Sequence, residues 1–274
     1  MREFGLNGAT TGTADLLTDL RAAREAGYDV LEIRDTKVRA YLEAGGRLEW
    51  FRGALQEAKL RVHTVNAIEH STHVGEAGSL GPLLARCATF CEYAQAVGAP
   101  YVVAVPSFLN EVADPERIVE DAAISLRAMA EVASGYGVGI GFEFLGFQDC
   151  SVNTLAAART IVDRAGRPNV GVVIDAFHYY AGGSTPAMLD GLDAARVYIV
   201  HLDDAEDRPR EELRDAHRLL PGDGVIPLRD LVRRIEALGY RGPWSIELFR
   251  PEYWAWDPVH LARVSREKMA ALFQ

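Results

Sequence analysis

The sequence predicts an α/β protein that folds as a single (β/α)8 TIM barrel, and three observations support this. The chain has 274 residues, close to the roughly 250 that such a barrel typically contains. Short apolar runs typical of buried strands alternate with helical patterns, giving eight strand–helix units. Several of these runs end abruptly in an acid or a histidine. The eight units favour a closed barrel over an open sheet, so we expect residues 1–274 to form one domain.

The first half of the chain contains four of these units. Strands are expected at residues 3–7, 28–34, 60–66 and 101–106. The first helix has Thr13 or Asp15 available as its N-cap and stops at Gly27, and later helices are expected at residues 48–59, 80–97 and 114–136. Residues 67–78 lack a clean periodicity, so we expect them to form a loop at the mouth of the barrel.

The second half continues this alternation. Strands are expected at residues 138–143, 170–174, 196–201 and 242–247, and helices at residues 153–164, 228–238 and 258–272. The helical signal after the sixth strand is weak, because Gly182, Gly183 and Pro186 interrupt it before residues 188–192. A long polar segment, residues 204–224, follows the seventh strand.

The sixth strand organises the predicted site. Val170 to Ile174 carry no polar side chain, as expected of a strand buried on both faces. Asp175 stands where this strand leaves the core, and His178 follows in what we expect to be the connecting loop. Barrel enzymes place their reactive groups at the C-terminal ends of the strands. The run therefore indicates an active site at that end of the barrel.

Four successive strands of the second half end in a potential metal ligand: Glu143, Asp175, His201 and Glu247. Each alone also fits a loop cap, an ion-pair partner or a core histidine, but together they aim four ligands at one rim. Three converging carboxylates repel one another, and a divalent cation removes that penalty. We therefore predict one bound ion, Mn²⁺, Mg²⁺, Co²⁺ or Zn²⁺, able to chelate a hydroxyketone and to polarise its carbonyl.

Other side chains are expected around this ring. We expect His178 to donate a hydrogen bond to a substrate oxygen, and Asp203 to face the same mouth because it lies two residues after His201. Asp203 or Asp204 alternatively orients His201 through its second ring nitrogen. Further residues are expected to line the opposite wall, to cover the pocket or to pack a subunit interface: His63, Asn66, Glu69, His70, Arg250, Tyr253, Trp254 and Trp256.

The composition limits the classes of partner. A formal charge of -10 and a pI near 5.2 disfavour nucleic-acid binding, which usually needs a basic surface. No leader-like start or membrane-spanning apolar run is found, so we expect a cytoplasmic protein. Three cysteines in a long chain argue against a disulfide framework. We therefore expect a small-molecule substrate, with neither nucleic acid nor membrane as a partner; a homo-oligomer is left open.

Several stretches resemble the sugar isomerase/epimerase superfamily with a xylose-isomerase-like barrel, and within it the inosose isomerases of bacterial inositol catabolism. The match runs over nearly the whole chain. The strand-end acids and the element Asp175-Ala-Phe-His178 are shared across the superfamily. More particular are Cys150-Ser-Val-Asn-Thr154 and Glu247-Leu-Phe-Arg-Pro-Glu-Tyr253, and further matches are Glu143-Phe-Leu-Gly146, His201-Leu-Asp-Asp204 and Pro221-Gly-Asp-Gly224.

The resemblance implies specific roles for the residues at the strand ends. It assigns the metal to Glu143, Asp175, His201 and Glu247, and a substrate contact to His178. By similarity to the ketose epimerases, Glu143 and Glu247 are also the acid/base pair. An epimerase-type arginine six residues after the metal histidine is missing, because Asp207 stands there.

The expected function is therefore isomerisation of a polyhydroxylated ketone, a cyclitol or sugar such as 2-keto-myo-inositol, by proton transfer through an enediolate. Alternatives on the same scaffold are a dehydratase of the inosose or dehydroshikimate type and a ketose epimerase. An endonuclease of the related barrel group is disfavoured by the acidity of the chain. A non-catalytic barrel that binds a polyol is the alternative from another class.

Overall fold

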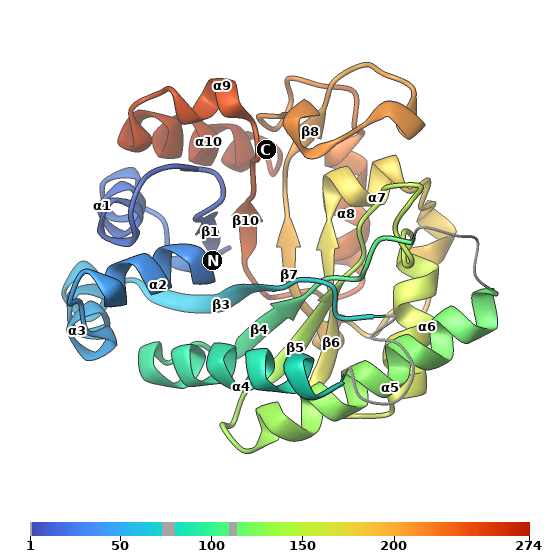
Figure 1. The fold of residues 1–274 in the computed structure, drawn as a ribbon. Helices are drawn as coiled ribbons and strands as arrows, with labels where there is room; N and C mark the ends of the chain where they lie inside the picture. Colours follow the sequence, from blue (N-terminus) through green and yellow to red (C-terminus); the bar gives the residue numbers. More distant parts are fainter. Residues whose placement is uncertain (1, 73–79, 110–113) are drawn as a thin grey trace.

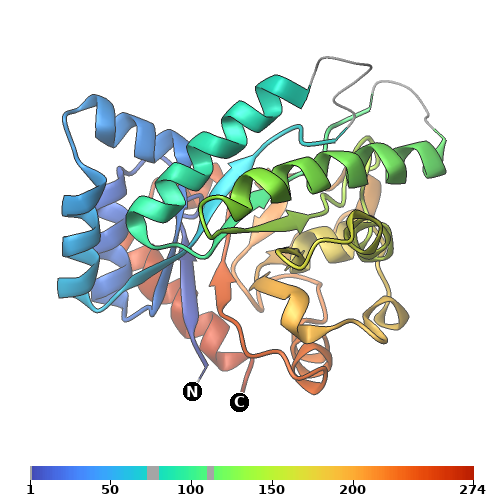
Figure 2. The ribbon, with the colours of Figure 1, turned by 90° about the horizontal axis from the view of Figure 1, so that it is seen from below.

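Eight parallel strands close into a barrel in the computed structural model, which describes residues 2–72, 80–109 and 114–274 (Figure 1). The order of hydrogen-bonded neighbours around the barrel is β1, β10, β7, β6, β5, β4, β3 and β2, and β2 closes on β1. Helices surround the strands, as the view from below also shows (Figure 2). The predicted fold class is therefore confirmed.

The barrel strands lie where the hydrophobic runs predict them, with small shifts at their ends. The third strand ends two residues later than expected, at Ile68, and the last strand is shorter, so that Glu247 directly follows it. The strands are β1 Phe4–Asn7, β2 Val30–Arg34, β3 Arg61–Ile68, β4 Tyr101–Ala104, β5 Gly139–Glu143, β6 Val170–Asp175, β7 Val197–His201 and β10 Trp244–Ile246.

The helices begin and end at the residues that the sequence marks for this. Asp15 accepts a hydrogen bond from Thr18 N at the start of α1, and Gly27 ends that helix in the left-handed conformation with φ 78°. No helix in the described part of the chain is long and apolar enough to cross a membrane. The α-helices are α1 Leu16–Ala26, α2 Asp35–Glu43, α3 Leu48–Ala58, α4 Leu80–Val97, α5 Pro115–Ser134, α6 Leu155–Ala165, α7 Ala176–Ala181, α8 Leu228–Ala237, α9 Pro251–Trp254 and α10 Pro258–Ala271.

The segment after β6 differs from the expected loop. His178 lies in the short helix α7, which begins immediately after the strand. Asp175 caps this helix, because its Oδ1 accepts a hydrogen bond from His178 N at 2.8 Å. A six-residue helix that contains two tyrosines and a phenylalanine shows too little periodicity to be predicted. The cap fixes His178 at the mouth of the barrel, directly above the strand end.

The polar segment 204–224 folds over the same end of the barrel. It contains the two-stranded antiparallel sheet of β8 Asp204–Ala205 and β9 Arg218–Leu219, with two short 3₁₀ turns between them. The buried Asp204 carboxylate accepts hydrogen bonds from the backbone of Gly222 and Ile226, at 3.0 and 2.8 Å. These contacts hold the segment in place and bring Arg218 to the strand ends.

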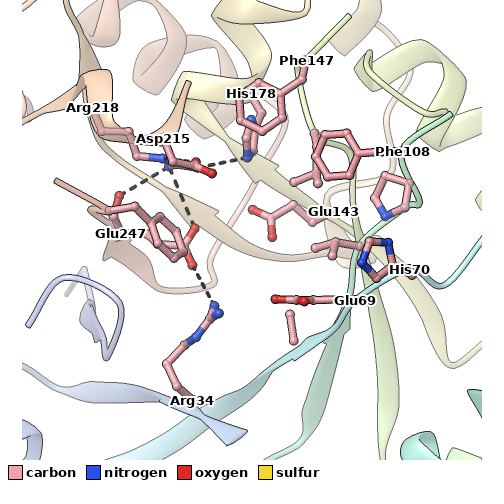
Figure 3. Close-up of a pocket in the computed structure, with 15 residues that line it drawn as sticks. Arg34, Glu69, His70, Phe108, Glu143, Phe147, His178, Asp215, Arg218 and Glu247 are labelled. Atoms are coloured by element: carbon pink, nitrogen blue, oxygen red, sulfur yellow. Dashed lines mark hydrogen bonds and ion pairs between the residues drawn. The ribbon is translucent and has the colours of Figure 1, made fainter. Parts of the chain in front are cut away.

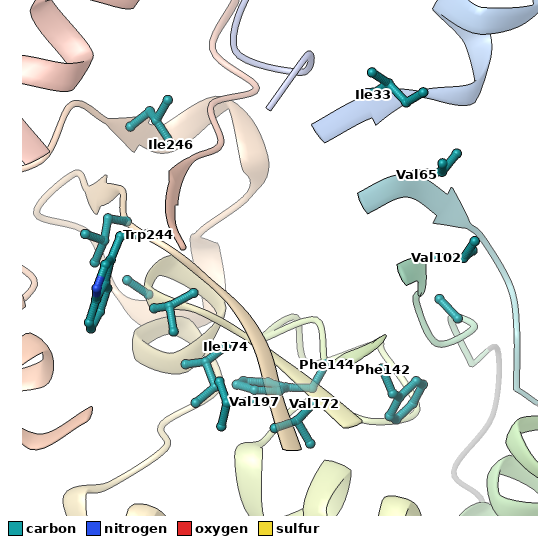
Figure 4. Packing of buried hydrophobic residues seen from close by; sticks show 14 of the residues in the cluster. Ile33, Val65, Val102, Phe142, Phe144, Val172, Ile174, Val197, Trp244 and Ile246 are labelled. Atoms are coloured by element: carbon teal, nitrogen blue, oxygen red, sulfur yellow. The ribbon is translucent and has the colours of Figure 1, made fainter. Parts of the chain in front are cut away.

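The apolar core lies mainly between the outer face of the barrel and the helices. Figure 4 shows part of it, with Ile33, Val65 and Val102 projecting from β2, β3 and β4. A smaller cluster around Val173 fills the barrel interior. Because side chains alternate along a strand, Val173 and Asp175 face the same side. The residue pattern that fills the interior therefore also directs the terminal carboxylate inward.

Gly171 on β6 is required by close packing. A Cβ atom at this position would lie 2.4 Å from the Arg196 carbonyl oxygen and 2.7 Å from the ring of Tyr198. We expect Gly171→Ala to lower the free energy of unfolding by about 1–3 kcal/mol, because the backbone of β7 must shift. Gly53→Ala in α3 is the matched control: its Cβ meets no atom within 4 Å, and we expect it to stabilise the protein by about 0.5–1 kcal/mol. Urea denaturation of both variants checks this, and equal effects would contradict it.

Candidate active site

Four buried side chains at the ends of adjacent strands meet at the mouth of the barrel. Glu143, Asp175 and His201 are the last residues of β5, β6 and β7, and Glu247 directly follows β10. One ligand atom of each lies within 4.8 Å of the others. The structure thus brings together the four residues that the sequence predicts as metal ligands.

The Nδ1 atom of His201 lies among the three carboxylates. It is 3.0 Å from Glu143 Oε1, 3.2 Å from Glu247 Oε2 and 3.6 Å from Asp175 Oδ2. Three buried carboxylates this close to one another require positive charge between them. One imidazole nitrogen and three carboxylate groups suit a divalent cation such as Zn²⁺ or Mn²⁺. The set of donor atoms therefore fits the predicted metal ion.

Glu32 on β2 orients His201 from the other side of the ring. Its Oε1 lies 3.1 Å from His201 Nε2, and its Oε2 accepts a hydrogen bond from Thr64 Oγ1 at 2.7 Å. Burial opposes ionisation of Glu32, but the charge of His201 and these hydrogen bonds lower its pKa to about 2. An ionised Glu32 accepts a hydrogen bond from Nε2–H, so Nδ1 points at the carboxylates and can bind a cation once its own proton is displaced, as in carboxylate–histidine–metal arrangements.

Protons occupy this group when no cation does. Burial raises the pKa of Glu143 to about 7, and the nearby charges of Glu247 and Asp175 add to this against the opposing effect of His201. Burial lowers the pKa of His201, but the charges of Glu32, Glu247 and Glu143 outweigh it and raise that pKa well above its ordinary value. A carboxyl group that titrates near neutral pH is suited to proton transfer.

A cavity of about 210 Å³ opens above the four ligands (Figure 3). Glu143 and Glu247 form part of its floor, and aromatic rings including Phe108 and Phe147 form part of its wall. These two rings stack, with centroids 6.1 Å apart. The cavity is large enough for a compact polyol and leads directly to the carboxylates.

The ring of His178 lines this cavity and has a donor beside each nitrogen. Gly146 N is 3.1 Å from Nδ1 and Arg218 Nη2 is 3.0 Å from Nε2, so a neutral ring accepts one of these hydrogen bonds, through the nitrogen that carries no proton. Burial lowers the pKa of His178, although the charge of Asp175 opposes this. Gly146 permits the close approach of the two segments, since a Cβ there would lie 2.4 Å from the His178 carbonyl oxygen. The expected role of His178 as a donor to substrate stays a prediction.

Arg218 on β9 lies beside His178, and the sequence analysis did not identify it. Its Nη2 is 3.0 Å from His178 Nε2, and because a guanidinium can only donate, this contact is a hydrogen bond when Nε2 carries no proton. Its Nη1 is 2.6 Å from Asp175 Oδ2, and its Nε donates to Asp215 Oδ1 at 3.0 Å. Burial works against the ionised form of Asp175, but the Arg218 charge outweighs it and holds the pKa of Asp175 well below its usual range.

Arg218 places an arginine near the metal ligands, although none stands at the sequence position where the ketose epimerases have one. No arginine stands six residues after His201, yet Arg218 reaches the same strand ends from the end of the long polar segment. The signal available was its position just before Pro221-Gly-Asp-Gly224, one of the stretches that carry the family resemblance. Glu32 was missed because the sequence search took acids only at the last position of strands in the second half.

Asp203 does not face the cavity. Its carboxylate accepts hydrogen bonds from Phe177 N at 3.0 Å and from Arg218 Nη1. It therefore holds Arg218 in place, and neither it nor Asp204 orients His201. The physical reason is that the chain turns away after β7, so the alternation of a strand no longer applies.

Three other predicted substrate contacts also lie away from the described cavity wall. His63 Nε2 is 2.8 Å from the Tyr198 carbonyl, and Asn66 Nδ2 is 3.2 Å from Glu32 Oε2. Arg250 Nη1 pairs with Glu206 Oε1 at 2.6 Å. His63 and Arg250 thus have partners within the fold, whereas Oδ1 of Asn66 is buried without a hydrogen-bond partner among the described residues. Glu69 and His70, in contrast, do line the cavity; residues 73–78 of the same predicted loop lie outside the described residues.

Comparisons with known proteins agree with this geometry. A model of the xylose isomerase-like TIM barrel family matches residues 20–272. The inosose isomerase of Halalkalibacterium halodurans is 36% identical over 250 residues, which cover 90% of this chain and 88% of that protein. The chain belongs to the inosose isomerase family. A second member, the inosose isomerase of Bacillus velezensis, is 33% identical over 97% of this chain and 95% of its own length.

A solved structure similar to this chain carries a metal. The crystal structure of the IolI protein with a bound zinc atom has a TM-score of 0.94 and 30% identity to this chain, and covers 98% of this chain and 97% of that one. The family resemblance predicted from the sequence is therefore confirmed. The zinc atom in that relative also agrees with the predicted divalent cofactor.

We predict that Glu32→Gln weakens metal binding about 10- to 100-fold, because a neutral amide orients His201 less strongly than a carboxylate does. Titration of the metal-free protein with Zn²⁺ in competition with a chelating dye measures this. Glu57→Gln on the exposed surface of α3 removes the same charge far from the site and is the control. Equal affinities of the two variants would show that Glu32 does not orient His201.

The stability of the metal-free protein should depend on pH. Because the pKa values of Glu143 and His201 are raised on folding, their protons stabilise the folded chain at low pH, and this stabilisation is lost as pH rises through the folded values. We expect the melting temperature of metal-free protein to fall between about pH 6 and pH 8, and that of metal-loaded protein to fall less, since a bound cation displaces these protons. Thermal melts with and without Mn²⁺ test this. A difference in melting temperature between metal-loaded and metal-free protein that stays constant from about pH 6 to about pH 8 would contradict the prediction.

Proposed function

We propose that this chain is a divalent-metal-dependent inosose isomerase, which moves the carbonyl group of 2-keto-myo-inositol to a neighbouring carbon. One observation carries the proposal: the buried ligands Glu143, Asp175, His201 and Glu247 converge, two of them, Glu143 and Glu247, at a cavity, in a chain that aligns with inosose isomerases over nearly its full length. A bound cation there would polarise the ketone and stabilise the negative charge of the enediolate.

The substrate is held by groups above the floor of the cavity. His178 and Arg218 both line the cavity, and the N–H groups of Arg218 can donate to a substrate oxygen. Both are fully or almost fully buried, so their hydrogen bonds to a bound oxygen are shielded from water. We assign them to the orientation of the hydroxyketone, with the reacting carbons directed at the two glutamates.

Glu143 and Glu247 are the proposed acid/base pair. One removes the proton from the carbon that bears the hydroxyl group, which gives the enediolate. The other donates a proton to the former carbonyl carbon, while the hydroxyl proton passes from one oxygen to the other. Asn7 Nδ2 donates to Glu247 Oε1 at 2.9 Å and fixes the orientation of that carboxylate. The two carbons exchange oxidation states within one molecule, so the reaction needs no redox cofactor.

Proton NMR in D₂O tests this function. We expect metal-loaded wild type to introduce deuterium next to the carbonyl of 2-keto-myo-inositol and to form an isomeric inosose. Glu143→Gln should lose about 10²–10⁴-fold in rate, because the amide cannot accept a proton. Glu57→Gln, with the same change of charge on α3, should match wild type.

The metal content of each variant must be measured in the same samples, because Glu143 is also a proposed ligand. A Glu143→Gln protein that holds a full equivalent of metal and exchanges at the wild-type rate would remove this glutamate from the mechanism. Loss of water with near-ultraviolet absorption of a conjugated ketone would instead identify a dehydratase. A wild type that neither exchanges deuterium nor converts the inosose would overturn the proposal.

A further inference from the structure

We infer that the cavity selects uncharged polyhydroxy ketones against anionic ones, and that Glu69 determines this selectivity. The inference rests on the proposed function, because it specifies the substrate class of the same site. It depends on three observations: the cationic side chains of the cavity are already paired, the Glu69 carboxylate is not, and the remaining wall is largely apolar.

The positive charge of Arg218 is already balanced by nearby carboxylates, so it does not attract an anionic substrate. Its guanidinium lies near four carboxylates, those of Asp175, Asp203, Asp215 and, at 3.9 Å, Glu247. It offers a directed N–H group to an oxygen atom, but its charge is more than balanced. An anion placed beside it would face these four carboxylates at short range.

Arg34 is the other cation of the described cavity wall. Its Nη1 lies 3.9 Å from Glu247 Oε1, and its guanidinium carbon lies 5.4 Å from the centre of the Phe249 ring. Figure 3 shows the Glu69 carboxylate pointing into the pocket on the side of Arg34. The charge of Arg34 is thus opposed by that of Glu247.

Glu69 follows β3 and contributes its carboxylate to the cavity. Its backbone oxygen accepts a hydrogen bond from Arg86 at 3.1 Å, which holds the main chain. Within the described residues, no hydrogen bond or ion pair engages its side chain. This exposed acceptor is available to the hydroxyl groups of a bound polyol, and it repels a carboxylate or phosphate.

The formal charges of the described cavity wall give the same result. Two cations, Arg34 and Arg218, stand against four acids, Glu69, Glu143, Asp215 and Glu247. With histidines counted as neutral, a divalent cation only balances the excess of two negative charges. Other wall residues, such as Phe108 and Phe249, carry no charge. A neutral substrate therefore enters without an electrostatic penalty, whereas an anionic one meets no surplus of positive charge.

The test compares two ketones of similar size, neutral 2-keto-myo-inositol and 3-dehydroshikimate, which carries a carboxylate. Calorimetry measures the binding of each to the metal-loaded protein. We expect Glu69→Gln to bind 3-dehydroshikimate about tenfold more tightly than wild type does, because a nearby like charge is removed. Binding of the neutral inosose should weaken by no more than a few fold, since an amide still accepts hydrogen bonds.

Glu57→Gln is the matched control, because it makes the same change of net charge on the exposed surface of α3. It should leave both affinities unchanged. The advantage of Glu69→Gln in binding the anion should also shrink as salt is raised from about 0.05 to about 0.5 M, because salt screens charges at an open cavity. A purely structural role of Glu69 would not produce this dependence.

No gain in 3-dehydroshikimate binding by Glu69→Gln, or tighter binding of the anion than of the neutral inosose by wild type, would overturn the inference. Deuterium exchange by wild type separates this result from the proposed function. Deuterium exchange without selection against the anion would support the isomerase proposal and rule out the role of Glu69. Selection against the anion without deuterium exchange would support the role of Glu69 and rule out the isomerase proposal.

Discussion

The barrel holds three buried carboxylates close together, and the arrangement of the site depends on how their mutual repulsion is balanced. Glu143, Asp175 and Glu247 lie at the ends of hydrogen-bonded neighbouring strands, so their side chains cannot move away from one another. Their charge must be balanced locally, and the fold supplies His201 between them and Arg218 beside Asp175. A divalent cation completes this balance. The convergence of these carboxylates favours the binding of a cation, and it adds to burial in raising the pKa of Glu143 to about 7.

The two histidines at this site are held by different hydrogen bonds. Glu32 accepts from Nε2 of His201, which points the other ring nitrogen at the carboxylates, where a cation would bind. The ring of His178 lies between two donors, Gly146 N beside Nδ1 and Arg218 Nη2 beside Nε2. Neither Glu32 nor Gly146 need touch substrate or metal. The orientation of both rings is thus fixed by the surrounding structure before any ligand binds, which reduces the reorganisation needed during the reaction.

The sequence predicted the parts of the site that follow from strand periodicity. Glu143, Asp175, His201 and Glu247 could be identified because each ends an apolar run and the ends of parallel strands share one rim. Irregular segments carry no such rule, and the position of Arg218 depends on how the β8–β9 sheet folds over the barrel. Other errors have the same origin: the strand alternation assumed for Asp203 does not continue beyond β7, and the helix that holds His178 is too short to show a period.

The residues proposed for proton transfer lie at the ends of regular strands, whereas the residue proposed for substrate selectivity lies in an irregular segment. The four ligands lie at strand ends that hydrogen bonds and core packing hold on both sides, so their geometry tolerates little change. Glu69 follows the last residue of β3, and its side chain is not tied to the described fold. Its replacement alters the charge of the cavity without moving a ligand. A barrel of this type can therefore retain its proton-transfer chemistry while the residues just beyond its strands change which ketone it admits.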